Sequence, residues 1–148
     1  MCMDMDKLSE YLFDLYIQLP RRFKRLFYAS MQDQELQLGL SELKILNELD
    51  KIGPCKMSDL SDALVVTMGG LTPHVDKLVE KGLVRRFRDE ERDRRLVLVE
   101  ITDQGQRLLK ETKEQFLRTL EHHLEKFTNE EKDDIAKAVE TLRRTFEF

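Results

Sequence analysis

The period of the hydrophobic residues changes after Gly82. Before Gly82 the apolar residues recur every three or four positions, which predicts amphipathic helices. Two β-prone runs follow, over 83–87 and 96–101, and the stretch between them, 88–95, is fully charged and has no Pro or Gly. Two such runs predict an antiparallel hairpin with a wide, basic tip. Helical periodicity then returns, so the fold class is mainly α with one small β-hairpin.

Three short helices are expected before the hairpin, between one long helix at the start of the chain and two at its end. The expected helices cover residues 6–31, 41–51, 58–64, 68–81, 103–127 and 129–146. Pro20 should kink the first, Ser41 is a plausible N-cap, and Gly82 is the expected left-handed stop. Thr128 and Glu131 fit a capping box. Three short helices and a hairpin follow the order of a winged helix-turn-helix, in which the hairpin is the wing.

The long outer helices carry apolar stripes that so small a body cannot cover. An apolar stripe that its own chain does not cover is usually buried against a second copy of the chain, so the need to bury these stripes predicts a homodimer. We therefore divide the chain into a helical dimerisation region, 1–35 and 103–148, and a winged helix-turn-helix DNA-binding domain, 36–102.

The net charge of −4 argues against nucleic acid, because DNA-binding domains are usually basic. The charges are unevenly distributed, however. Residues 81–100 hold seven basic and five acidic side chains, and six of the seven are arginine, whose planar guanidinium suits phosphates and base edges. Because the acidic residues are interleaved, a solvated and salt-bridged hairpin is the alternative interpretation. The pattern predicts that DNA binding, if present, is concentrated on the hairpin.

Two stretches resemble the MarR-type (multiple antibiotic resistance regulator) transcription factors. In the first, Asp93, Arg95, Ile101 and Thr102 fit the family's wing pattern without a gap, and in the second, residues 60–86 resemble its helix-turn-helix with the closing Lys-Gly-Leu-Val-Arg-Arg. The resemblance covers nearly the whole chain. It implies a homodimeric regulator, expected to be a repressor, that binds a pseudo-palindromic operator in double-stranded DNA. It also implies release by a small-molecule effector such as an aromatic anion.

The resemblance also implies roles for individual residues. The base-reading positions would be Thr67, Met68, Gly69, Gly70, Thr72, Pro73, His74 and Lys77. On the wing, the residues expected to bind the minor groove are Arg94 and Arg95, and those expected to bind phosphates are Arg85, Arg86, Arg88 and Arg92. Asp93 would support the wing by pairing with Arg95.

Gly69, Gly70 and Pro73 depart from the family, which usually has polar or basic residues there. Either the reading helix starts near Met68 with Thr67 as its N-cap, or it starts at Pro73 with Thr72 as its N-cap. The ungapped match favours the first alternative. We hypothesise that the two glycines and the proline allow close approach of the backbone to DNA.

Sensor variants of the same regulator are alternatives. Cys2 or Cys55 could make it redox-responsive, although Cys55 is expected to pack as a small hydrophobic residue. Metal sensing would use Cys55 with His74, His122 and His123, but these lack the spacing of a zinc site, so no metal or other cofactor is expected.

Effector-binding residues stay unassigned. Tyr11, Tyr16, Phe23 and Phe27 could line a pocket, with a cation from the basic run 21–25, but ordinary packing explains each of them as well.

Other function classes have little support in the sequence. The chain has no Gly-rich phosphate loop, nucleophile elbow or metal-binding helix motif, so it is not expected to be an enzyme. It has no membrane-spanning stretch and no secretory signal, and a reducing cytoplasm is the expected location. A winged-helix module that binds a protein instead of DNA remains the alternative from another class.

Overall fold

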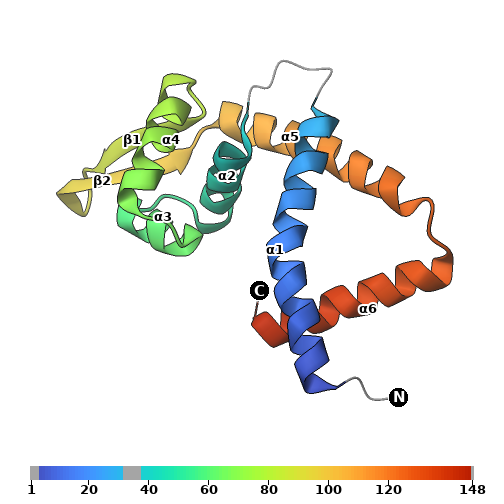
Figure 1. The fold of residues 1–148 in the computed structure, drawn as a ribbon. Coiled ribbons are helices and arrows are strands. Elements are labelled where there is room, and N and C mark those ends of the chain that lie inside the picture. Colours follow the sequence, from blue (N-terminus) through green and yellow to red (C-terminus); the bar gives the residue numbers. More distant parts are fainter. Residues whose placement is uncertain (1–3, 32–37, 148) are drawn as a thin grey trace.

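The structure is a computed structural model and describes residues 4–31 and 38–147 (Figure 1). The helices are α1 (Met5–Ser30), α2 (Leu40–Ile52), α3 (Met57–Leu64), α4 (Met68–Glu80), α5 (Asp103–Leu124) and α6 (Asn129–Phe146), and the strands are β1 (Val84–Asp89) and β2 (Asp93–Ile101). The expected fold class, mainly α with one hairpin wing, is confirmed. No helix in the described ranges is long and apolar enough to cross a lipid bilayer.

Two details of the expected helices differ from the structure. Ser41 was expected to cap α2, but the helix begins at Leu40 with Gly39 as its N-cap, because the Glu42 carboxylate accepts from the Gly39 N–H. α5 ends at Leu124 instead of 127, since residues 125–127 form a turn that leaves Thr128 extended as the N-cap of α6. Pro20 lies inside α1, which is helical from Met5 to Ser30, and the expected kink there stays a prediction.

The DNA-binding domain expected from the sequence is organised around one hydrophobic core. Helices α2, α3 and α4 enclose it, the base of the hairpin closes one side, and Leu109 of α5 reaches it from outside. Its fully buried side chains include Leu46, Leu49, Leu60, Leu78, Val75, Val84 and Val99. The second turn of α5, which holds Leu109, is therefore fixed to this core (Figure 1).

The hairpin is anchored at its base by a short bridge. Cys55, in the loop before α3, exchanges backbone hydrogen bonds with Val99 of β2, at N···O distances of 3.1 and 2.8 Å. Gly82, with a φ of 73°, turns the chain from α4 into β1, as expected from the sequence. The Leu83 N–H then donates to the Leu78 carbonyl at 2.9 Å, which completes a helix-ending Schellman motif.

The tip of the hairpin is narrower than predicted. Asp89 pairs with Asp93 across the strands, so only residues 90–92 form the turn, and most of the charged stretch lies within the strands. The Asp89 Oδ1 accepts from the Arg92 N–H at 3.1 Å, and the Asp93 Oδ1 accepts from the Arg95 N–H at 2.9 Å. These carboxylates stabilise a tight turn without Gly or Pro, which explains why the wide tip was wrong.

The outer helices leave apolar surface exposed. α1 contacts α5 through Phe27, which is fully buried and lies edge-on to Phe116 at 5.5 Å between ring centroids. Figure 1 shows α6 returning from the far end of α5 toward the amino-terminal half of α1. None of the residues of α6 is buried within the chain. The large apolar side chains exposed on α1 include Met5, Tyr11, Phe13, Tyr16 and Phe23.

Candidate nucleic-acid interface

Helix α4 begins at Met68, which confirms the first of the two alternatives for the reading helix. Thr67 is the N-cap, and its Oγ1 accepts from the Gly70 N–H at 3.1 Å. The alternative start at Pro73 is wrong, because Pro73 lies inside the helix and the Thr72 hydroxyl donates to the Met68 carbonyl at 2.8 Å.

One face of α4 packs into the core and the other is open. Leu71, Val75 and Leu78 are buried, whereas all but one of the expected reading residues are exposed and Thr72 is half-buried. A Cβ added to Gly69 would meet no atom within 4 Å. The amino-terminal half of α4 therefore presents an open surface with small side chains at its centre.

The turn before α4 carries features that the sequence analysis missed. Val65 adopts a left-handed conformation, with φ 55° and ψ 47°, and is exposed together with Val66. A groove of about 500 Å³ runs between this turn, α4 and the start of α2, where Ser41 and Lys44 line it opposite His74. Ser41 and Lys44 gave no signal in the sequence, because only the packing of α2 against α4 brings them to this surface.

Two of the wing arginines are already paired with acidic side chains. Arg85 pairs with Glu100, its cross-strand neighbour, and its guanidinium lies over the Phe87 ring at 4.8 Å from the centroid. Arg86 pairs with Asp76 of α4 and so connects the wing to the reading helix. These charges are neutralised at the base of the wing.

The arginines nearer the tip are exposed. Within residues 4–31 and 38–147, the ion pairs of the structure do not include Arg88, Arg92, Arg94 or Arg95. The expected contact between Asp93 and Arg95 exists, but it runs to the main-chain N–H of Arg95 and leaves the guanidinium exposed. The wing arginines outside ion pairs thus lie near the tip, where the Asp89, Glu90, Glu91 and Asp93 carboxylates are interleaved with them.

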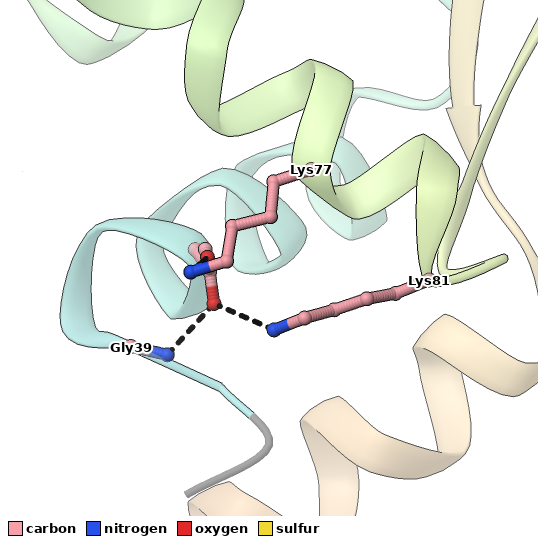
Figure 2. Close-up of polar contacts among 4 residues, drawn as sticks. Gly39, Lys77 and Lys81 are labelled. Atoms are coloured by element: carbon pink, nitrogen blue, oxygen red, sulfur yellow. Dashed lines mark hydrogen bonds and ion pairs between the residues drawn. The ribbon is translucent and has the colours of Figure 1, made fainter.

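The sequence analysis did not single out Glu42, a carboxylate in the first turn of α2 that meets Lys77 and Lys81 (Figure 2). The side chain of Glu42 is only 4% exposed, and its Oε1 lies 3.1 Å from the Nζ of Lys77. Its Oε2 accepts from the Gly39 N–H at 2.9 Å and lies 3.4 Å from the Nζ of Lys81. Burial raises the pKa of Glu42, but the Gly39 hydrogen bond and the two lysines outweigh it, so the pKa is lowered overall. Lys77, expected to read DNA, is therefore paired with a carboxylate of α2.

The described cysteine, Cys55, and the three histidines form no metal cluster. Cys55 is buried, and burial, followed by the nearby Asp59 and Glu48 carboxylates, raises the pKa of its thiol, which disfavours the reactive thiolate. Cys2 lies outside the described residues. No group of three or more His, Cys, Asp or Glu side chains in the described part of the chain could hold a metal ion.

Two cavities lie beside the basic run of α1. Arg21, Arg25 and Tyr28 line one of about 500 Å³. The other has a volume of about 440 Å³ and is lined by Phe23 and by His123 of α5, and Arg25 lines both cavities. Of the other aromatic residues expected near an effector, Phe27 packs against Phe116 in the interior, whereas Tyr11 and Tyr16 are exposed on α1.

Comparison with known proteins gives consistent matches over this fold. The model of the MarR family matches residues 38–97. The chain is 30% identical over 101 residues to the uncharacterised HTH-type transcriptional regulator YpoP of Bacillus subtilis, a match that covers 68% of this chain and 71% of that protein. The crystal structure of the transcriptional regulator BldR from Sulfolobus solfataricus has a TM-score of 0.77 and 28% identity, with 98% of this chain and 99% of that chain covered. A mutant MarR from E. coli, solved in complex with operator DNA, has a TM-score of 0.69 and 23% identity over 95% of this chain and 99% of that chain.

Proposed function

The chain belongs to the MarR family of DNA-binding transcriptional regulators, and from this we propose that it is a homodimeric repressor that a small-molecule effector releases from its operator. Its family and fold are those of transcriptional regulators and not of enzymes.

The observation that carries the proposed mode of DNA binding is an open reading helix together with exposed arginines near the wing tip. In this proposal Thr67 and residues 68–74 of α4 enter the major groove, where the bare surface at Gly69 allows close approach. Arg94 and Arg95 enter the adjacent minor groove, whose negative potential attracts arginine. Arg88 and Arg92 bind phosphates, and residues 36–102 act as the DNA-binding domain.

The exposed apolar surface of the outer helices supports the proposed homodimer. α1 and α6 line an apolar groove of about 340 Å³, with Leu15, Tyr16, Leu142 and Phe146 among its walls. A second copy would supply the apolar contacts that α6 lacks within its own chain. Residues 1–35 and 103–148 then form the dimerisation region. Two reading helices of such a dimer would take half-sites about 34–36 Å apart.

The cavities beside the basic run of α1 support an effector that is an aromatic anion. Arg21 and Arg25 would supply the cation, and Tyr28 and Phe23 would supply aromatic surface. Release requires that the anion bind more tightly to a dimer whose reading helices are wrongly spaced for the operator.

A selection of binding sites from random double-stranded DNA tests the proposal. We expect the chain to enrich a pseudo-palindromic sequence, bound by a dimer, with an affinity that falls as salt rises. Phenolic acids that raise the melting temperature of the protein should release the selected duplex in a gel-shift assay. Absent or salt-insensitive DNA binding would overturn the proposal and favour the protein-interaction module.

A further inference from the structure

We propose that Glu42 withholds Lys77 from DNA, so that the reading helix approaches the bases without a free cation. This inference rests on the proposed mode of DNA binding. It makes Glu42 a positioning residue, because it acts on DNA only through the lysine that it holds.

Lys77 is placed on α4 where a free lysine side chain could contact DNA. It follows Pro73 by four residues, so the two side chains start from the same face of α4. The Lys77 side chain is 58% exposed, yet its Nζ lies 3.1 Å from the Glu42 Oε1. Figure 2 shows the lysine directed back across α2, where the carboxylate lies. If it were released, the same side chain could reach a phosphate beside the helix.

Losing a lysine partner would destabilise the Glu42 carboxylate. Glu42 is nearly buried, and a buried charge is costly unless partners surround it. The Gly39 N–H and Lys81 satisfy one carboxylate oxygen, and Lys77 is the contact of the other. A DNA phosphate would attract Lys77 through water, which screens the attraction, whereas the Glu42 carboxylate that it contacts is nearly buried. Moving Lys77 to a phosphate would also leave the buried Glu42 carboxylate with one partner fewer. Lys77 is therefore expected to stay with Glu42 in the complex.

The second charged residue of this part of α4 is also paired. Asp76, one position before Lys77, pairs with Arg86 of the wing. The surface that faces the DNA in our proposal then offers hydroxyl, apolar and main-chain groups instead of free charge. Such a surface gains little from the phosphates of an arbitrary duplex, so it should favour the operator over random DNA.

The test is the salt dependence of DNA binding by a Glu42→Gln variant. Gln keeps the size of the side chain and an oxygen that can accept from the Gly39 N–H, but it lacks the charge that holds Lys77. The probes are a random-sequence duplex of about 30 base pairs, long enough for two half-sites, and the duplex that the wild type selects. For the random duplex we expect the slope of log K against log salt to become steeper by about 2 per dimer, one phosphate contact for each Lys77. The preference for the selected duplex should fall.

Three further variants separate the released lysine from other effects. Glu48→Gln removes the same charge from the same helix outside the Glu42 cluster, and it should leave the slope near that of the wild type. Lys77→Gln should also leave the slope unchanged, because Lys77 contributes nothing to phosphate binding while Glu42 holds it. The double variant Glu42→Gln with Lys77→Gln should return to the wild-type slope.

Two results would overturn the inference. One is a Glu42→Gln slope that equals the Glu48→Gln slope. The other is a Lys77→Gln slope that is flatter than the wild type by about 2, since Lys77 would then bind phosphate in the native complex. If circular dichroism shows that Glu42→Gln does not fold, the Lys77→Gln slope decides alone. A wild type that binds neither duplex would instead overturn the proposed function.

Discussion

Gly105, in the first turn of α5, allows a sharp test of how the hairpin docks onto that helix. A Cβ at this position would lie 2.2 Å from the Leu83 carbonyl oxygen and 2.8 Å from the Cγ1 of Ile101. The same carbonyl already accepts from the Thr102 N–H at 3.0 Å, and the Thr102 Oγ1 accepts from the Gly105 N–H at 3.1 Å. The junction therefore has no room for a methyl group.

The expected sign of Gly105→Ala is opposite to that of most such changes. In an unobstructed helix, Gly→Ala stabilises by up to about 1 kcal/mol. Here the carbonyl could move away only by weakening its bond to Thr102, and inserting a carbon into a tight site typically costs about 1–3 kcal/mol. Because the Cβ would lie only 2.2 Å from a main-chain oxygen, the cost should be at the upper end of this range, and the gain from helix propensity reduces it to a net loss of about 2 kcal/mol. For a chain of this length that lowers the melting temperature by about 4–8 °C.

Gly69→Ala is the matched control, because a Cβ at Gly69 meets nothing within 4 Å. It should raise the melting temperature by about 2–4 °C, the gain expected from helix propensity alone. Both variants are compared with the wild type by calorimetry at one protein concentration. If Gly105→Ala stabilised the protein as much as Gly69→Ala, the close contact between Leu83 and α5 would be refuted.

Four further outcomes follow from the structure. Replacing both Arg94 and Arg95 with Gln should flatten the slope of log K against log salt by up to about 4 per dimer, measured by gel shift, and an unchanged slope would place the wing tip away from DNA. Because the folded-state pKa of Glu42 is lowered, its contribution to stability is present above the ordinary carboxyl pKa and is lost as pH falls through the lowered pKa. Urea midpoints measured from about pH 6 to pH 3 should therefore fall less in Glu42→Gln than in the wild type. Val65→Asn should stabilise the protein by about 1 kcal/mol and so raise its urea midpoint, because Asn tolerates the left-handed conformation better than a β-branched residue. A lower midpoint would contradict the idea that the left-handed backbone strains Val65. Cys55 should react slowly with iodoacetamide at about pH 7 and much faster in denaturant, as followed by peptide mass spectrometry, and rapid labelling of the native chain would count against its burial.

Local chemistry made much of the fold predictable from the sequence. Apolar spacing is a property of neighbouring residues, so it identified each helix, and the cap at Thr128 followed from its own hydroxyl group and Glu131. Local chemistry left Thr67 and Thr72 as alternative caps of α4, and only the resemblance to the family favoured Thr67, which the structure confirms. The stop at Gly82 was equally local, since its φ of 73° suits glycine. The start of α2 was missed although its determinant is also local. Gly39 has no capping side chain, and the cap is the bond from its N–H to the Glu42 carboxylate three residues later.

The candidate interface was predictable as a set of segments but not as a set of free charges. The sequence identified the arginines of the wing, yet the pairing of Arg85 with Glu100 depends on strand register and that of Arg86 with Asp76 on the docking of α4. Lys77 and Glu42 lie 35 positions apart, and no local pattern indicates that they meet. The left-handed Val65 was also unexpected, since sequence rules favour Gly or Asn at such a turn.

The bridge between Cys55 and Val99 makes the wing a lever with its pivot near the core. Asp93 lies six positions before Val99 in β2, so the tip extends about 20 Å beyond the bridge. A rotation of about 10° at the pivot would therefore displace the tip by about 3.5 Å, more than half the minor-groove width of about 6 Å. A rearrangement too small to disturb the core could thus carry the tip arginines from one wall of the groove to the other.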